Sequence, residues 1–391
     1  MKRIFQRGGR LPFMRAYRSS ALLRQSPSTP APLTVGNVQA GLRDVGQFVT
    51  SHSELIGKYI SPLKVKVDAG DVLALIDVAS YRAGMNFLYG DVAVDTFSTI
   101  DKRPDDKVTL VTIAFNSFVF TKPIYEGDLV MLTSRVVSAS NSTVGLHVNV
   151  ERQGYESRIP ESIGESFVTF VAIQGKKLDS KSSGHVPAAR LSSLYELQLH
   201  KRYKALRNQK LLSSPPSPLT AEAIELECNR CKERKITIRE TTTVANRTFF
   251  GSSVNVNGVI FGGEVLRFME QSALHCGRVF AGTPHIHTVA MLGMTFDEPV
   301  ALGDRPVSTC RVVCVRNSTM LVTVRVAATN GPTSRKTNAA SFILMATDDK
   351  GSLVDVPLGI DLDHATPEEL LEYWQGRCMM EESIKARGKD V

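Results

Sequence analysis

Apolar and polar positions follow the same order in two halves of the chain. Segments 71–84 and 262–278 each carry apolar residues at helical spacing along one face, which predicts two amphipathic helices. After each helix come four or five runs rich in Val, Thr, Ile and Phe, separated by turn signals, as is typical of strands. The clearest runs are 108–120, 128–139, 144–152 and 166–173, then 288–296, 307–315, 320–328 and 339–346. Because no second helix is interleaved, each half predicts an antiparallel sheet that meets one long helix.

The two halves also share residues in a fixed register. The frame F-x2-P-x3-G-D-x6-R-V-V-x3-N-S-T starts at Phe120 and recurs without a gap from Phe296, so all of its residues repeat at one constant offset. Solenoid units repeat every ~20–50 residues, so a period as long as this one indicates a duplicated domain instead. We therefore expect any functional site to lie where the two similar halves meet.

The segments outside the repeat complete the predicted domain organisation. Residues 186–212 are basic and predict a helical connector, which a Pro/Ser-rich stretch follows. Near the C-terminus, Thr366-Pro-Glu-Glu369 combines a capping threonine, a proline in the first turn and a glutamate three residues on, which predicts a helix start. The expected regions are an N-terminal arm at 1–43, a first domain at 44–175, a helical connector and linker at 176–237, a second domain at 238–350 and a helical tail at 351–391.

The net charge of +8 comes from the N-terminal arm. Residues 1–43 contain eight Lys and Arg and no acidic residue, so residues 44–391 hold 39 basic and 39 acidic residues. A neutral body argues against a nucleic-acid-binding surface.

Residues 1–33 are rich in Arg and Ser and mix apolar residues among the cations, which predicts a mitochondrial transit peptide and a matrix location; a disordered basic arm is the alternative. No apolar stretch approaches the ~18 residues that span a bilayer, so no transmembrane segment is expected.

Candidate chemistry lies where the second predicted helix begins. Asn255 precedes the pair Gly262 and Gly263 at the helix start, and Glu270 follows Asn255 by fifteen residues. Two glycines at a helix N-terminus expose backbone N–H donors to another group, an arrangement that suits a developing oxyanion. Taken alone, the same residues also fit a tight turn with a helix cap.

The first half departs from this pattern. Its helix carries Asp77 seven residues after Gly70, which is the spacing that Glu270 keeps from its own glycine. Fifteen residues before Asp77 stands Pro62, where the second half has its asparagine, and Ala69 replaces the first glycine of the pair. The first half therefore keeps the helix acid and lacks the amide.

Together these features resemble the hotdog fold of the acyl-CoA thioesterases, and above all the mitochondrial members in which two hotdog domains are fused in one chain. The resemblance rests on the Asn-x6-Gly-Gly entry into the helix, the acid fifteen residues after the Asn, and the F-x2-P-x3-G-D frame, over roughly 50–175 and 238–350. It implies an α+β fold of two tandem hotdog domains, each an antiparallel sheet wrapped around a central helix. The domains should pack as a pseudo-dimer with their sheets joined edge to edge. The resemblance also implies a homo-oligomer, commonly a trimer of such chains.

In this family the site is built across the interface, with the amide and the helix-start glycines from one domain and the acid from the other. The resemblance then implies a working site of Asp77 with Asn255, Gly262 and Gly263 that hydrolyses fatty acyl-CoA to the free acid and CoA. Asp77 would act as base or nucleophile, Asn255 would hold the water or the carbonyl, and the glycine N–H groups would stabilise the oxyanion. A second site, which would combine Ser61, Pro62 and Glu270, lacks the amide and is expected to be inactive.

Two other functions stay open at this point. A hotdog hydratase or dehydratase would pair a His with an acid, but the matching positions hold Asn255 and Pro62. We expect His275 to lie near the helix core, and His285 and His287 in a loop. The third possibility, a degenerate acyl-CoA-binding or scaffold protein, is favoured by the eroded motif of the first half.

Neither a metal nor a cofactor is expected. Cys228 and Cys231 form a lone C-x2-C, and no second ligand pair follows at finger-like spacing. Cys310 and Cys314 lie in an apolar run and are predicted to be core residues of a strand. A thioester has a good leaving group, so its hydrolysis needs no metal.

Overall fold

The computed structural model describes residues 41–57, 65–90, 108–174, 185–208 and 214–387, except 156, 158 and 256. The predicted transit peptide lies outside these residues, and so do Ser61 and Pro62. Among the described helices, none combines the length and the apolar character that crossing a membrane requires.

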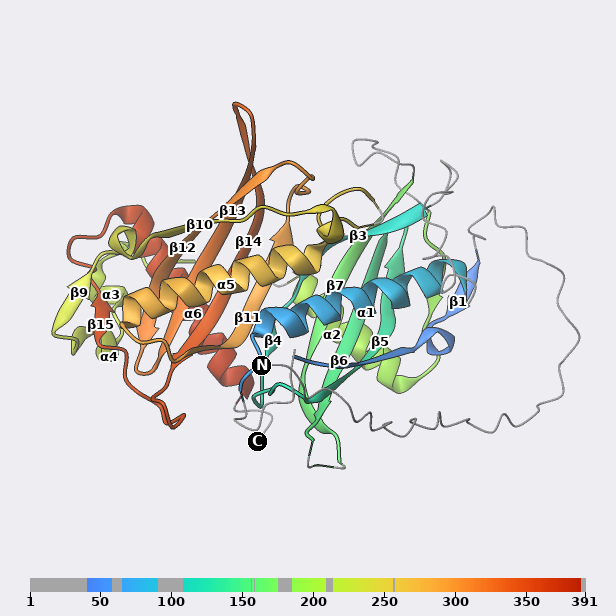
Figure 1. Ribbon diagram of the computed structural model, residues 1–391, viewed down its shortest axis with the longest axis horizontal. Coiled ribbons are helices and arrows are strands. Elements are labelled where there is room, and N and C mark those ends of the chain that lie inside the picture. Colours follow the sequence, from blue (N-terminus) through green and yellow to red (C-terminus); the bar gives the residue numbers. More distant parts are fainter. Residues whose placement is uncertain are drawn as a thin grey trace, which may run out of the picture. The chain divides into compact units, whose positions relative to one another are not determined.

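Two long helices form where the apolar spacing predicts them. α1 spans Ala69–Tyr89 and α5 spans Gly262–Ala281. Both end at a glycine with positive φ, Gly90 at 78° and Gly282 at 67°, a conformation that a residue without a side chain adopts at no steric cost. The apolar sides of the two helices pack on the same face of one sheet (Figure 1).

The sheet has eleven strands in the described part of the chain, and every pairing in it is antiparallel. The order is β10-β12-β13-β14-β11-β3-β7-β6-β5-β2, with β4 also paired to β11. The strands of the first half are β2 (Thr50–Leu55), β3 (Val108–Phe115), β4 (Phe118–Val119), β5 (Leu129–Ser140), β6 (Thr143–Gln153) and β7 (Glu161–Gln174). Those of the second half are β10 (Thr243–Asn246), β11 (Ile286–Phe296), β12 (Arg305–Arg316), β13 (Thr319–Asn330) and β14 (Thr333–Ala346).

The two halves join through their central strands. Phe115 of β3 lies opposite Met294 of β11, and Phe118 of β4 lies opposite Met291. In the register of the repeat, Phe115 corresponds to Met291 and Phe118 to Met294, so the two pairs are exchanged by a local two-fold axis. The predicted fold is confirmed: two tandem hotdog domains form a pseudo-dimer with one continuous sheet and both central helices on one side.

The duplication extends further than the sequence frame predicts. Each half also contains a short parallel ribbon and a second helix, all of them outside the main sheet. In the first half these are β1 (Leu42–Asp44) with β8 (Ala188–Arg190), followed by α2 (Leu194–Asn208). In the second half they are β9 (Arg234–Ile236) with β15 (Leu358–Ile360), followed by α6 (Pro367–Arg387). The predicted connector and tail are thus equivalent parts of two repeats.

Both outer helices start with the same cap. At α2, Ser193 Oγ accepts from the Glu196 N–H while the Glu196 carboxylate accepts from the Ser193 N–H. At α6, Thr366 and Glu369 exchange the same two bonds, as the sequence predicts. The middle of α6 then docks on the sheet, with Tyr373 buried.

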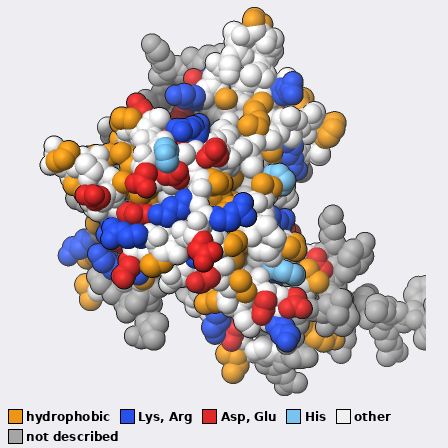
Figure 2. All heavy atoms as spheres, turned by 90° about the vertical axis from the view of Figure 1, so that its left-hand side faces the viewer, with side chains coloured by type: hydrophobic (Ala, Val, Ile, Leu, Met, Phe, Trp, Pro, Cys, Tyr) orange, Lys and Arg blue, Asp and Glu red, His pale blue; other side chains and the backbone are white. Residues whose placement is uncertain are grey.

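The remaining described helices are short. They are α3 (Ala221–Ile224), α4 (Glu227–Arg230), and the 3-10 helices η1 (Val45–Phe48), η3 (Ile238–Thr241) and η4 (Gly251–Ser253). On the end of the molecule formed by the second half, acidic and basic side chains are interspersed (Figure 2). Cys310 and Cys314 are buried core residues of β12, as predicted.

Candidate functional site

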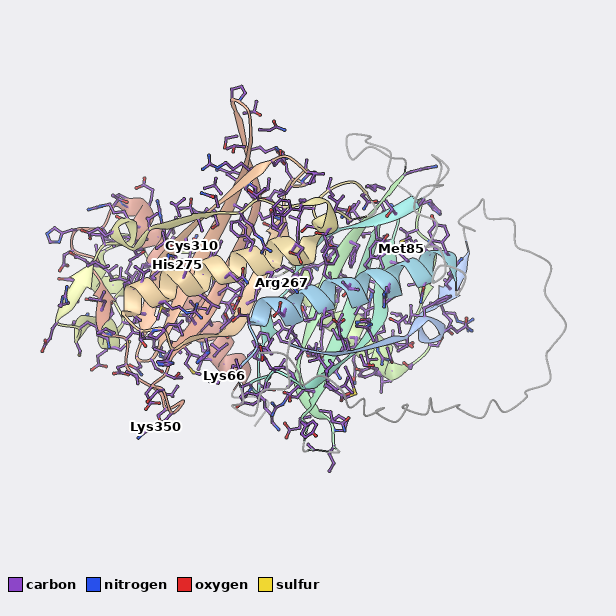
Figure 3. All side chains as sticks on the ribbon, in the orientation of Figure 1. Lys66, Met85, Arg267, His275, Cys310 and Lys350 are labelled. Atoms are coloured by element: carbon purple, nitrogen blue, oxygen red, sulfur yellow. The ribbon has the colours of Figure 1, made fainter. Side chains whose placement is uncertain are left out.

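The N-terminal turns of α1 and α5 lie against each other at the junction of the two halves. A Cβ on Gly263 would lie 2.9 Å from Ala74 Cβ, and a Cβ on Gly70 would lie 2.9 Å from Arg267 Cα. Neither glycine therefore has room for a side chain, and the two helices touch through their backbones. Figure 3 shows Arg267 where α5 passes the start of α1, and its guanidinium pairs with Asp71 Oδ1 at 2.6 Å.

Asp77 reaches from α1 of the first half to the start of α5 in the second. The Gly263 N–H donates to Asp77 Oδ2 at 3.0 Å, and Thr112 Oγ1 donates to Oδ1 at 2.8 Å. The side chain is only 1% exposed. Burial raises the pKa of Asp77 to about 6, against the lowering effect of the Thr112 and Gly263 bonds. The carboxyl group therefore titrates close to neutral pH while a helix N-terminus holds it in place.

Gly262 leaves the space beside this carboxylate open. A Cβ at position 262 would lie 2.9 Å from Asp77 Oδ2 and 3.1 Å from Phe296 Cε1. In the described part of the chain, the Gly262 N–H has no hydrogen-bond acceptor. A reacting group can thus approach Asp77 next to a bare N–H donor at the positive end of α5.

Asn255 is oriented by its own loop. Its Oδ1 accepts from the Asn257 N–H at 2.8 Å and more weakly from the Val259 N–H at 3.4 Å, and its own N–H donates to Val259 O. This Asx turn fixes the carboxamide because the oxygen is used inside the loop. The Nδ2 amino group has no hydrogen-bond acceptor among the described residues, so it is the part of the carboxamide that can donate to a ligand.

Asp77, Asn255 and Gly262 line one cavity of about 620 Å³ between the two halves. The first half contributes side chains of α1, β3 and β7, apolar ones together with Tyr81, Arg82 and Thr112. The second half contributes the loop 252–261, the start of α5 and the end of β11. The structure therefore brings together the four residues predicted for the working site, since Gly263 lies behind Gly262 and bonds Asp77. Their catalytic roles stay predictions.

Glu270 does not line this cavity. It is fully buried on α5, and Thr288 Oγ1 donates to its Oε1 at 2.5 Å. Its Oε2 is buried and has no hydrogen-bond partner among the described residues. Burial, with smaller contributions from the charges of Asp68 and Asp71, raises the pKa of Glu270 to about 8, so this acid is protonated at neutral pH. The segment predicted to face it, with Ser61 and Pro62, lies outside the described residues.

Sequence reasoning missed the threonines that hold the two acids. Thr112 and Thr288 are related by the same offset as Phe120 and Phe296, and they stand only eight positions before the frame starts. Extending the comparison upstream of Phe120 would have found them.

Two of the three expected histidine positions were wrong. His275 lies on α5 but is exposed, and His287 lies within β11 instead of a loop. Burial, together with the charge of Lys66, lowers the pKa of His287 to about 4. Among the described residues that line the cavity, none is a histidine, so a hydratase site of the His-and-acid type is not formed there.

Comparison with known proteins gives a family for part of the second half. Residues 257–334 match the model of the thioesterase superfamily. No curated protein matches the sequence. The chain is similar in structure to an acyl-CoA hydrolase from Staphylococcus aureus in complex with butyryl coenzyme A, coenzyme A and coenzyme A disulfide (19% identity, 40% of this chain and 94% of that chain, TM-score 0.36).

Two solved structures cover more of the chain. One is described as an oleoyl thioesterase from Lactobacillus plantarum (8% identity, 77% of this chain and 96% of that chain, TM-score 0.48). The other is the 12:0-ACP thioesterase from Umbellularia californica (10% identity, 77% and 98%, TM-score 0.46). The matched segment 257–334 starts in the Asn255 loop and runs through α5 and the strands behind it. Through this thioesterase-superfamily domain, the protein is a thioester hydrolase with the hotdog fold.

Proposed function

We propose that the protein hydrolyses fatty acyl-CoA to the free fatty acid and CoA at the cavity between its two halves. The observation that carries the proposal is the bond from the Gly263 N–H of one half to the Asp77 carboxylate of the other, inside a cavity that Asn255 also lines. It supports a site composed of both halves, and it supports the pairing of Asp77 with Asn255.

The chemistry follows from where the charges develop. The Asp77 carboxylate takes a proton from a water molecule whose oxygen attacks the thioester carbon; direct attack by the carboxylate is the alternative route. The Gly262 N–H and the Asn255 amide then donate to the carbonyl oxygen as it gains negative charge. Collapse of the tetrahedral intermediate breaks the carbon–sulfur bond. CoA leaves as the thiolate and takes up a proton, and the acid is released.

The two glycines at the start of α5 have different roles in the proposed site. Gly263 uses its N–H to hold Asp77, so Gly262 is left to face the substrate. This assignment requires a carboxylate, because a protonated Asp77 can neither accept a proton from water nor attack the carbonyl. With its pKa raised to about 6, Asp77 is ionised at neutral pH and still basic enough to accept a proton.

The test is turnover of a panel of acyl-CoAs by purified protein, with a thiol reagent to report free CoA. Thiol release by the wild type, and its loss in Asp77→Asn, would support hydrolysis at this site. A change in enoyl absorbance without thiol release would indicate a hydratase. Binding of acyl-CoA without turnover would indicate a scaffold protein and contradict the proposal.

We also propose a homo-oligomer, most simply a trimer of these chains, in the mitochondrial matrix. The oligomer rests on the resemblance to fused hotdog thioesterases, and the location rests on the composition of residues 1–33. Light scattering at micromolar protein that gave the mass of one chain would contradict the oligomer. Failure of residues 1–43 to direct a fused reporter into mitochondria would contradict the location.

A further inference from the structure

The junction of the two central helices brings two carboxylates of like charge together. Asp71 lies in the first turn of α1 and Glu264 in the first turn of α5. Each stands six residues before the acid of its own helix, so the two positions are equivalent in the two halves. Each carboxylate is favourable at the N-terminus of its own helix, but the two repel each other where the helix starts meet.

One arginine of α5 lies between these two carboxylates. The guanidinium of Arg267 forms an ion pair with Asp71 Oδ1 at 2.6 Å through Nε, and its Nη1 donates to Glu264 Oε1 at 2.5 Å. Among the described residues, Asp71 has no other ion pair, and Arg247 contacts only the second oxygen of Glu264, at 3.4 Å. Without the Arg267 charge, Asp71 and Glu264 Oε1 would lie close together with no described cation between them.

The first half has no equivalent of this arginine. Ala74 stands at the corresponding position of α1, three residues after the acid of the first turn. A Cβ on Gly263 would lie 2.9 Å from Ala74 Cβ, and a Cβ on Gly70 would lie 2.9 Å from Arg267 Cα, so both positions belong to the same crossing of the helices. Figure 3 shows Arg267 at this crossing. The repeated geometry therefore supplies two carboxylates, and one half supplies the guanidinium for both.

The same start of α5 holds the Asp77 carboxylate. Gly263, whose N–H donates to Asp77 Oδ2 at 3.0 Å, immediately precedes Glu264. On α1, Asp77 follows Asp71 by six residues, or about 9 Å along the helix axis. Both contacts hold the start of α5 on α1. Repulsion between Asp71 and Glu264 would therefore also lengthen the bond from Gly263 to Asp77.

We propose that Arg267 is a positioning residue for Asp77: by neutralising the two carboxylates at the junction, it keeps the start of α5 on the proposed base. This rests on the proposed function, in which the Asp77 carboxylate accepts a proton from water. The N–H bond from Gly263 favours the ionised form of Asp77, so a longer bond raises the pKa of Asp77 above about 6. Less of the carboxylate is then ionised at acidic pH, and turnover there falls.

The Asp77 carboxylate has no direct contact with a charged side chain in the described part of the chain. Its hydrogen bonds come from Thr112 and Gly263. The charged groups of the elements packed around it are Asp71 and Arg82 on α1, Glu264, Arg267 and Glu270 on α5, and Asp297 and Glu298 after β11. Arg267 joins an acid of one half to an acid of the other, so its removal changes the contact between the halves as well as the local charge.

The test is the pH profile of kcat/KM in Arg267→Met, which keeps an apolar stem and removes the charge. The acid midpoint should rise by about 0.5–1 pH unit, as partial loss of one hydrogen bond to a carboxylate predicts. Turnover should then fall about 2- to 6-fold at pH 6 and less at pH 8. Asp71→Asn alone should keep the wild-type profile, because no pair of carboxylates remains. Asp71→Asn added to Arg267→Met should restore the wild-type midpoint.

Arg377→Met is the matched control. Arg377 pairs with Glu381 at 2.9 Å, its side chain is 30% exposed like that of Arg267, and it lies on α6 and does not line the cavity. Its substitution should leave the midpoint unchanged. Should Arg267→Met not fold, Arg267→Gln, which keeps a polar end and lacks the charge, is measured with the same expectation.

Two results would overturn the proposal. A wild-type midpoint in the Arg267 variant would show that the arginine contributes to stability alone. A raised midpoint that Asp71→Asn does not restore would show that repulsion between the two carboxylates is not the cause.

A failure of the proposed function gives a different result. The wild type would then release no thiol, and NMR titration of labelled carboxyl carbons would take the place of kinetics, with the Asp77 signal assigned by its absence from Asp77→Asn. A higher midpoint for Asp77 in Arg267→Met than in the wild type would support the positioning role without any turnover. Equal midpoints in the two proteins would contradict it.

Discussion

Asp77 and Glu270 occupy equivalent places in the two halves and differ in the groups that contact their carboxyl oxygens. Each lies seven residues after a glycine in the first turn of its helix, is buried, and accepts a bond from a threonine of the following strand. Of the two acids, only Asp77 has a partner for its second oxygen among the described residues, the Gly263 N–H of the opposite helix. The pKa is raised to about 6 for Asp77 and to about 8 for Glu270. At neutral pH the fold thus holds one carboxylate and one neutral acid.

The cause lies at the start of the opposing helix. α5 begins with two glycines, and a side chain at Gly262 would come within 2.9 Å of Asp77 Oδ2. α1 begins with Ala69 where α5 has Gly262, and Ala69 is buried. A helix acid in this fold becomes a candidate base only where a glycine pair and an open cavity meet it. A buried acid alone does not make a site.

The largest effect is expected for Asp77→Asn. An amide cannot accept a proton from water or attack a thioester, so kcat/KM should fall about 100- to 10,000-fold, the range for loss of a general base. Thiol release from acyl-CoA measures this, and an unchanged circular dichroism spectrum shows that the fold persists. Full activity in Asp77→Asn beside an inactive Glu270→Gln would reverse the comparison and place the site within the second half.

Asn255→Ala should cost about 100- to 1000-fold in kcat, as the loss of one oxyanion-type donor does in other enzymes. The substitution also removes the Asx turn, so Asn255→Asp is the more informative variant. It keeps the oxygen that the Asn257 and Val259 N–H groups need and replaces the amino group with a carboxylate oxygen, which is charged and cannot donate. Both variants should be inactive, while Asn330→Ala, at the exposed end of β13, should match the wild type. An active Asn255→Asp would show that the loop conformation matters and the donor does not.

Gly262→Ala gives α5 an alanine at the position where α1 has Ala69. Its Cβ would crowd Asp77 Oδ2 and Phe296, and overpacking of this kind costs ~1–3 kcal/mol, or about 5- to 150-fold if it falls on the transition state. Gly251→Ala is the control, because a Cβ there would meet no atom within 4 Å. Steady-state kinetics of the two variants on one acyl-CoA measures how much activity each substitution removes. Equal activity of both would remove Gly262 from the explanation of the asymmetry.

The sequence predicts the fold well because the repeated frame encodes local geometry. Gly127 and Gly303 adopt φ of 90° and 96° in equivalent turns. The following residues, Asp128 and Asp304, accept N–H bonds from three residues upstream, and each pairs with an arginine, Arg152 of β6 and Arg335 of β14. The turn and its N–H bond are local in the chain, so both halves keep them. The frame therefore identifies the duplicated domain, although its glycine and aspartate lie away from the cavity.

The site was predictable only in part, because it depends on how the halves differ and on contacts distant in sequence. The glycine pair and the helix acids could be found from spacing. The bond between Gly263 and Asp77 joins residues 186 positions apart, and the family resemblance alone indicated it. The residues around Asn338 in the sequence do not show that its side-chain Oδ1 is buried and without a hydrogen-bond partner among the described residues. That property exists only once β14 lies beside β11.

The pH dependence of turnover should follow the acid that faces the cavity. Hydrolysis needs the Asp77 carboxylate, so kcat/KM should fall about tenfold per unit below pH ~6 and level off above it. This rests on the raised pKa of Asp77, which burial causes. Rate profiles of the wild type and Glu270→Gln should share this midpoint. A midpoint near 8 that disappears in Glu270→Gln would assign the catalytic titration to the other acid.

The smallest effect on turnover is expected for Glu270→Gln, which should change kcat/KM by less than about threefold, or below about 1 kcal/mol. Its effect on stability should be larger and should depend on pH. Because the pKa of Glu270 rises from 4.5 to about 8 on folding, the folded protein keeps a proton that the unfolded chain releases between these values. The stability from this group is therefore complete below pH ~4.5 and is lost as pH rises toward 8 and beyond.

Glutamine has no proton to lose, so Glu270→Gln removes this loss of stability. Chemical unfolding should show the variant and the wild type alike at pH 4.5, and the variant more stable at pH 9. All other titrating groups are common to both proteins, so the difference between the two curves isolates Glu270. A wild type that is more stable than the variant at pH 9 would show that Glu270 is ionised in the folded state. The two acids would then be alike, and the asymmetry of the sites would need another cause.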